Sequence, residues 1–335
     1  MDTLKAMNKY KLGLILFIIV ILGVVCLINF EKSEHHNDDK YLSIDYRRVI
    51  KKLGTYKNVK YRKLNKSISN CDIDEEMYRE LDFKKILQET TKDEGKIVSA
   101  NLYVTDKDGI ERFRNYVTYF HVGNSWLGQD FDKRFLENKL KSPQKVDLCF
   151  FNNCFKNAKV QLKNVKYFKE IDLVSILSKK ENTKLSVDEY KQTLKESSQR
   201  RTYELVDVMQ ENEIFQKVMN NTVFKKIPQL YIDNYMIQMK NHGMSPKNRD
   251  AKSVAIETVK ENAFRFCAFD DAKIKITDKE YKAFLEKEYE HYKDQFKSAS
   301  EFEERYSKTM ILDNLKKKKI NNYILKYAKG EKENE

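Results

Sequence analysis

The chain has 335 residues, with 64 Lys and Arg against 51 Asp and Glu and a formal net charge of +13. Nine glycines and three prolines exclude collagen-like and Pro/Gly-rich low-complexity proteins and favour long helices. Because the lysines are dispersed among glutamates, the positive charge alone does not predict nucleic acid as a partner.

Near the N-terminus, residues 12–30 (LGLILFIIVILGVVCLINF) form an uncharged apolar run. As a helix the run spans roughly 28 Å, about the hydrocarbon thickness of a bilayer, so it predicts one membrane-spanning helix with the lipid bilayer as a partner. Three lysines precede it, which favours residues 1–11 in the cytoplasm and residues 31–335 on the extracytoplasmic side. The alternatives are a cleaved signal peptide and a lipoprotein signal at Cys26, but the run is long and no small residue directly precedes that cysteine.

The polar segment 31–45 is expected to be a linker, and its adjacent His35 and His36 make a poor ligand set, so no metal site is predicted. Within 46–92, the segment KNVKYRKL predicts a strand. Asp72 and Glu75 have capping-box spacing and predict the start of a helix that runs to about residue 91.

Residues 93–172 change to the period-two pattern of strands, with β-branched and aromatic residues. Four strands are expected at 97–105 (IVSANLYVT), 114–122 (RNYVTYFHV), 145–151 (KVDLCFF) and 159–168 (KVQLKNVKYF). Asp108 and Gly109 mark a turn between the first two, and a short helix is expected at 131–140. Cys149 and Cys154 are close enough to form a disulfide across a turn, although two free thiols are equally compatible with the sequence.

Residues 173–330 are expected to be helical. Five helices are predicted: one capped by Ser186 and Glu189 that runs towards Met219, one from Pro228 to about Gly243, one over 250–270, one capped by Thr277 and Glu280, and one from Ser300 to about Lys329. The basic run Lys316 to Lys319 is expected on a solvated helix face.

Several segments, in this order, resemble bacterial trigger factor and its membrane-anchored relatives. They are 53–61 (LGTYKNVKY), the Asp108-Gly109 turn followed by Phe113, 123–135 (GNSWLGQDFDKRF), 151–155 (FNNCF), and the helix starts at 185–196, 227–239 and 276–287. The resemblance implies an α+β fold in which a small FKBP-like antiparallel β domain (93–172) is inserted in an α-helical chaperone domain of the trigger-factor or SurA type. That helical domain would comprise 46–92 and 173–330, and the ribosome-binding domain has no counterpart.

By the same resemblance, six aromatic residues fall at the positions of a prolyl-isomerase pocket: Tyr103, Phe113, Trp126, Phe131, Phe151 and Phe155. Isomerisation needs a dry aromatic pocket and a backbone N–H donor rather than a nucleophile. The chain departs from the family at Gly128-Gln129-Asp130 and at Asn152, which predicts a degenerate pocket. The alternative role of these aromatic residues is to fill the core.

The helical part contains apolar residues that are candidates for contact with unfolded clients, since tyrosine and methionine suit adaptable contacts. They are Tyr231, Tyr235, Met236, Met239, Tyr281, Phe284, Tyr289, Tyr292 and Phe296. The alternative is that they pack helix against helix.

No GxSxG, HExxH, P-loop or dinucleotide fingerprint occurs, and no cofactor is expected. The sequence therefore predicts a membrane-anchored, extracytoplasmic folding chaperone that binds unfolded or newly translocated polypeptides and no nucleic acid. An active peptidyl-prolyl isomerase and a non-catalytic scaffold of an envelope complex are the alternatives.

Overall fold

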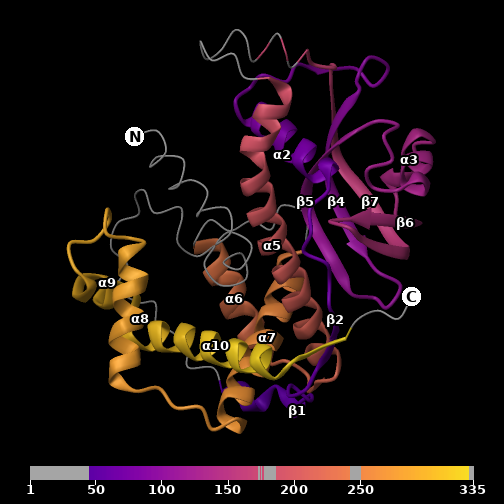
Figure 1. Cartoon of the computed structure of the whole chain (residues 1–335). Helices are drawn as coiled ribbons and strands as arrows, with labels where there is room; N and C mark the ends of the chain where they lie inside the picture. The colour runs from indigo at the N-terminus through magenta and orange to yellow at the C-terminus, as the bar shows by residue number, and fades with distance from the viewer. Residues whose placement is uncertain (1–44, 173, 175, 177–185, 242–249, 332–335) are drawn as a thin grey trace. The chain divides into compact units, whose positions relative to one another are not determined.

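The structure, a computed structural model, describes residues 45–172, 174, 176, 186–241 and 250–331 (Figure 1). The chain divides into two compact units. Of the described residues, the helical unit comprises 45–60 and those within Lys217–Lys329, and the sheet unit comprises those within Tyr61–Gln216 together with 330–331. Each unit is described by itself below.

The sheet unit contains an antiparallel five-stranded sheet made of β3 (Glu89–Thr90), β4 (Ile97–Thr105), β5 (Glu111–His121), β6 (Gln144–Phe150) and β7 (Asn153–Phe168). The order is β3-β7-β4-β5, and β6 pairs with the first half of β7. The strand predicted at 97–105 coincides with β4, and the other three predicted strands overlap β5, β6 and β7. The Asp108-Gly109 turn is also present: Gly109 has a φ of +78°, and Asp106 Oδ1 accepts hydrogen bonds from the N–H groups of Asp108 and Ile110.

Both faces of this sheet are covered, at least in part, within its own unit. Val98, Ala100, Leu102 and Val104 alternate along β4 and belong to a buried cluster with residues of α3 (Gln129–Leu136) and α5 (Val187–Asn220). On the other face, Ile97 is buried with Met77 and Leu81 of α2 (Asn70–Phe83). Figure 1 shows α3 against one side of the sheet. A short 3-10 helix, η2 (Lys139–Lys141), follows α3.

In the helical unit, α7 (Ala251–Asp271) packs against both α6 (Gln229–Asn241) and α10 (Lys308–Tyr327). A second cluster joins α8 (Asp278–Glu290), α9 (Ala299–Tyr306) and the first half of α10 around Phe284, Phe302 and Ile311. The 3-10 helix η1 (Tyr46–Arg48) and the strand pair β1 (Ile50–Lys52) and β8 (Val223–Phe224) complete the unit. The remaining pair is β2 (Lys60–Arg62) with β9 (Lys329–Glu331).

The helix boundaries confirm some of the predicted caps and correct others. The Ser186–Glu189 and Thr277–Glu280 pairs cap α5 and α8 as expected. The cap of α2 is Ser69 with Asp72, one turn before the predicted pair, since the hydroxyl of Ser69 supplies the N-terminal acceptor. The single helix predicted from Ser300 is instead α9 and α10, because Ser307 interrupts the helix at a φ of +60° and caps α10 through Met310 N–H.

Among the helices that the structure describes, none has the length and apolarity needed to cross a bilayer. The run expected to do so, 12–30, lies outside the described residues, as do most of the linker and Gly243. The fold class predicted above is therefore corrected to a mixed α/β fold in which no described helix could cross a membrane. The single-pass placement, with residues 31–335 extracytoplasmic and the lipid bilayer as a partner, was inferred from that helix and is withdrawn with it.

The question left open for Cys149 and Cys154 is resolved in favour of a disulfide. The two residues face each other across the β6–β7 hairpin, which makes them direct neighbours in the strand register. Cys71 and Cys267 are free thiols, each partly buried.

Candidate functional site

Four of the six residues predicted for an isomerase pocket are core residues of the sheet unit. Phe113, Phe131, Phe151 and Phe155 are at most 6% exposed and lie in one buried cluster. Neighbouring rings fill the space around them: Phe113 is 4.9 Å from Phe150, measured between ring centroids, and Phe131 packs edge-on against Phe120 at 5.4 Å. None of the four lines either of the two cavities described below.

Of the other two predicted pocket residues, Tyr103 is not part of this cluster, whereas Trp126 is partly buried and packs against it. Tyr103 donates a hydrogen bond to Asn115 Oδ1 (2.9 Å), and the ammonium group of Lys163 lies 4.9 Å from its ring centroid. Its neighbours Leu102 and Val104 point to the opposite, buried face of β4. Trp126 stacks on Tyr78 of α2, with a centroid distance of 5.8 Å. None of the six aromatic residues lines either of the two cavities described below.

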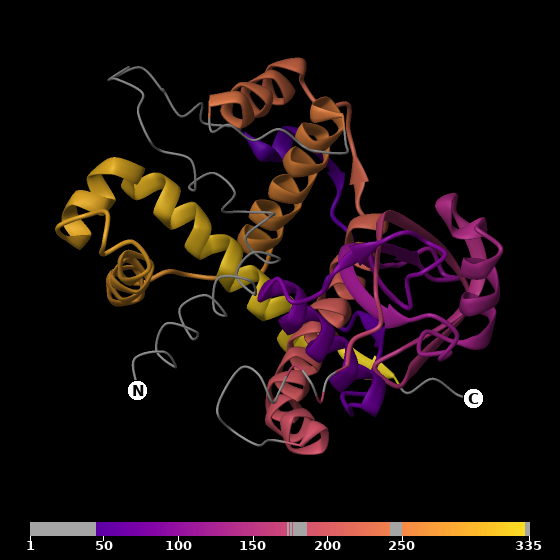
Figure 2. The ribbon, with the colours of Figure 1, turned by 90° about the horizontal axis from the view of Figure 1, so that it is seen from above.

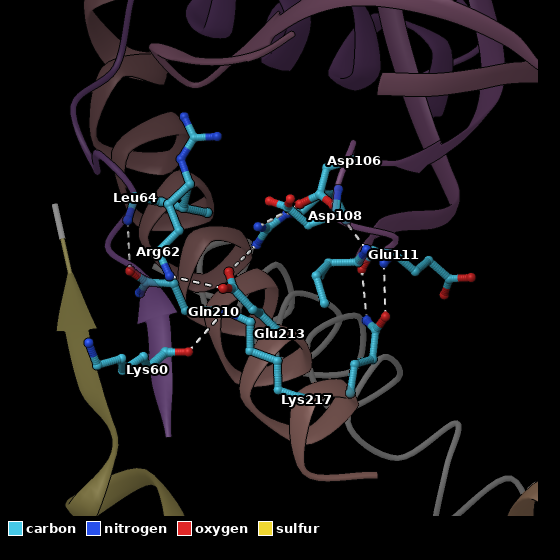
Figure 3. Close-up of polar contacts among 12 residues, drawn as sticks. Lys60, Arg62, Leu64, Asp106, Asp108, Glu111, Gln210, Glu213 and Lys217 are labelled. Carbon is cyan, nitrogen blue, oxygen red and sulfur yellow. Dashed lines mark hydrogen bonds and ion pairs between the residues drawn. The ribbon is translucent and has the colours of Figure 1, made fainter. Parts of the chain in front are cut away.

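The sheet unit also contains a buried ionic cluster that the sequence did not predict (Figure 3). Arg112 donates to Asp106 Oδ2 through Nε (2.7 Å) and to Glu213 Oε2 through Nη1 (2.5 Å). The three side chains are between 2% and 6% exposed. Since each charge has an opposite partner at hydrogen-bond distance, the cluster satisfies the requirement for burying charges in a core.

Next to this cluster, side chains of α5 hydrogen-bond to the main chain of an extended segment, as Figure 3 shows. Glu213 Oε1 accepts from the N–H of Arg62 (3.0 Å), and Gln210 Oε1 accepts from the N–H of Leu64 (2.9 Å). In the same way, the amide of Gln216 accepts from the N–H of Glu111 (2.9 Å) and donates to its carbonyl (3.0 Å). Carboxylate and amide side chains on one helix face thus replace a partner strand.

Three of the nine residues predicted to contact clients are buried in the helical unit, and six are partly exposed. Tyr231, Tyr281 and Phe284 are at most 8% exposed, and the remaining six are half-buried. Tyr289, Tyr292 and Phe296 pack in the cluster of α8, α9 and α10, and Tyr235 packs near β1 and α7. The large exposed apolar residues of α6 are instead Leu230 (56%) and Ile237 (57%), which the sequence analysis did not single out.

The larger of the two cavities lies in the helical unit and has a volume of about 680 Å³. We call it the α7 groove. Three helices supply most of the lining. From α7 come Phe266, Cys267 and Asp270, and from α6 come Asn234, Tyr235 and Gln238. The start of α10 and its N-cap supply Ser307, Thr309, Asp313 and Lys316. Residues 45–47 complete the lining. Figure 2 shows α7 between α6 and the yellow α10.

Aromatic rings and paired charges line the α7 groove. Tyr46 stacks on Phe266 with a centroid distance of 4.9 Å and an interplanar angle of 17°. Arg47 pairs with Asp270 (2.9 Å), and Lys316 pairs with Asp313 (3.0 Å). Burial, with a smaller contribution from Asp270, raises the pKa of the Cys267 thiol, so this cysteine is not an activated nucleophile.

A second cavity of about 510 Å³ lies between α8 and α9, and its lining includes Tyr281, Leu285 and Glu303. The Tyr281 hydroxyl donates to Glu303 across it (2.6 Å). Within the described part of the chain, no group of three or more His, Cys, Asp or Glu side chains is arranged to hold a metal ion. Among the described residues that line the two cavities, no histidine lies beside a hydroxyl or thiol group.

The comparisons with known proteins give little beyond this geometry. No protein-family model matches the chain. No curated protein matches it either. Among solved structures, the chain is similar to a trigger factor chaperone from a study of promiscuous substrate recognition in folding and assembly activities. The identity is 11%, the TM-score is 0.35, and the match covers 83% of this chain and 73% of that one. A TM-score this low does not establish a common fold.

Proposed function

We propose that this protein is a folding factor that holds apolar segments of non-native polypeptides in the α7 groove. The observation that carries the proposal is an aromatic-lined groove of about 680 Å³ beside two exposed apolar residues of α6, Leu230 and Ile237. Ligand sites have volumes of roughly 300–1,000 Å³ and combine apolar walls with a few polar groups. The trigger-factor resemblance of the sequence supports the same function.

We propose further that the sheet unit is not a catalyst. A prolyl isomerase must enclose the substrate's amide in an accessible aromatic pocket. Phe113, Phe131, Phe151 and Phe155 are buried among their own neighbours, so their rings offer no such surface. Their role in this proposal is to fill the core.

The test is suppression of aggregation by the full chain when guanidinium-unfolded citrate synthase is diluted into buffer. We expect suppression near equimolar ratio. The double variant Leu230→Ser/Ile237→Ser should lose several-fold in potency, because it removes apolar contact area without disturbing the core. Val117→Ser is the matched control, since Val117 is an exposed apolar residue (37%) of the sheet unit. Unchanged aggregation at several-fold molar excess of the full chain would refute the proposal.

The same sample should be assayed for isomerisation of a proline-containing peptide. We expect the uncatalysed rate, with no change in the Tyr103→Ala variant. Turnover that Tyr103→Ala abolishes would establish the sheet unit as an active isomerase instead.

A further inference from the structure

One row of side chains in the α7 groove has no partner within the described part of the chain. Asn234 and Gln238 both line the groove, one helical turn apart on α6, and neither amide makes a hydrogen bond to a described residue. Each side-chain amide offers two donors and a carbonyl acceptor. The row therefore presents unused hydrogen-bonding capacity to whatever enters the groove.

The spacing of this row matches an extended peptide. Residues four apart on a helix are displaced by about 6 Å along its axis, and alternate residues of a strand by roughly 6.6 Å. A chain lying along α6 would thus place the main-chain groups of alternate residues opposite Asn234 and Gln238.

The sheet unit already contains this arrangement with its own chain as the occupant. Gln210 and Glu213, three apart on α5, bind the N–H groups of Leu64 and Arg62, which are two apart on an extended segment (Figure 3). Gln216 binds both the N–H and the carbonyl of Glu111. On α5 the polar side chains, three residues apart, already bind main-chain groups, whereas on α6 the two amides, four residues apart, line a groove.

The neighbouring residues of α6 indicate what kind of segment fits. Leu230, Asn234 and Ile237 have i, i+4, i+7 spacing, so the exposed apolar side chains lie on the same stripe of the helix as the amides. The charged residues of the groove form ion pairs. Asp45 Oδ2 lies 3.3 Å from Arg48 Nε, Asp270 pairs with Arg47, and Asp313 pairs with Lys316. Among the described residues that line the groove, every charged side chain therefore has an oppositely charged partner, which disfavours selection of a charged ligand.

We propose that Asn234 and Gln238 bind the main chain of an extended, uncharged polypeptide segment that lies along α6, while Leu230 and Ile237 contact its apolar side chains. This inference rests on the proposed function and specifies how the client is recognised. Main-chain recognition explains how one groove accepts segments of different sequence, because every peptide presents the same N–H and carbonyl groups.

The test measures binding of a fluorescent, uncharged peptide with alternating Val and Thr residues to the full chain. We expect Asn234→Ala/Gln238→Ala to weaken binding about tenfold, the effect of losing two ordinary hydrogen bonds. The control is Asp233→Ala/Lys240→Ala, which changes two exposed residues of the same helix without changing the net charge and should bind as the unmodified chain does. The isosteric Asn234→Asp/Gln238→Glu variant removes the amide donors while keeping the side-chain shape, and it should also bind weakly.

A second peptide, N-methylated at alternate residues, lacks half of the main-chain donors and tests the same bonds from the ligand side. If the amides of Asn234 and Gln238 bind the main chain, the losses of binding free energy caused by methylation and by Asn234→Ala/Gln238→Ala are not additive. Alkylation of Cys267, which lines the groove, should be slowed by bound peptide, whereas alkylation of Cys71 in the sheet unit should not.

The outcomes separate the two proposals. If the peptide binds with equal affinity to the unmodified chain and to both amide variants, or if Cys267 is not protected, main-chain recognition by α6 is wrong while the folding-factor proposal stands. If neither the peptide nor unfolded citrate synthase binds to the unmodified chain, the folding-factor proposal itself fails.

Discussion

The sheet unit and the helical unit use aromatic residues in opposite ways. In the sheet unit, Phe131 is fully buried and packs against the rings of Phe120 and Phe135. In the helical unit, Tyr46 and Phe266 stack on each other and still line an open groove. Aromatic content alone therefore does not distinguish a core from a binding surface, and the accessibility of the rings does.

The first prediction sharpens this comparison with one substitution in each unit. Phe131→Ala should lower the free energy of unfolding by about 3–5 kcal/mol, because it leaves a cavity in a filled core. Phe266→Ala should cost roughly 1–2 kcal/mol, since that ring is only half-buried. Urea denaturation of the full chain measures both, and equal losses would contradict the distinction between the two units.

A second prediction concerns charges on one strand of the sheet unit. Arg112→Met should lower the free energy of unfolding by about 3–4 kcal/mol, because Asp106 and Glu213 would keep their buried charges without a partner. Arg114→Met is the matched control: Arg114 pairs with Glu111 at the surface, and its loss should cost less than about 1 kcal/mol. The same denaturation experiment decides between a buried ionic cluster and a solvated one.

The disulfide gives a third, smaller effect. Replacing both Cys149 and Cys154 by serine should destabilise the protein by about 2 kcal/mol, the chain-entropy value for a short closed loop. Adding a reductant should lower the stability of the unmodified chain to that of the double variant and leave the variant unchanged. A reductant effect on the variant would mean that some other group responds.

The smallest expected effect lies at the surface of the helical unit. A hydrogen bond from Lys319, followed by the cap contacts of Thr277, lowers the pKa of Glu280 to about 2. A lowered pKa in the folded state stabilises the protein above the unfolded-state value and loses that contribution as the pH falls towards 2. Lys319→Met should therefore raise the pKa of Glu280, as followed by NMR titration. The control is Lys318→Met, because Lys318 lies over Phe284 rather than beside Glu280.

Local patterns in the sequence predicted the sheet well. The strand at 97–105 was predicted with its observed bounds, because β-branched and aromatic residues follow a period of two there and a turn with glycine follows. The caps at Ser186 and Thr277 were also predicted, since a hydroxyl and a glutamate three residues later form a local signal. The break at Ser307 was missed because no glycine or proline marks it.

The site was harder to predict because it depends on contacts between distant residues. Arg112 and Glu213 are 101 residues apart, and no local pattern links them. Period-two alternation places Phe113 or Phe155 on one face of a strand but does not reveal that this face is covered. Leu230 and Ile237 are seven residues apart, so they lie on one face of α6, and this face differs from the one that carries the buried Tyr231 and Ile232. The sequence shows the spacing, but it does not show which of the two faces is buried.

The pairing of β2 with β9 has a consequence for synthesis of the chain on the ribosome. The carbonyl of Glu331 accepts from the N–H of Lys63 (2.8 Å), and the carbonyl of Val59 accepts from the N–H of Lys329 (2.9 Å). β2 therefore has no partner strand until β9, about 270 residues later in the chain, has been synthesised. Until residue 329 is made, this edge of β2 has no partner strand, so a nascent chain stalled before that residue exposes an edge at which edge-to-edge association can occur.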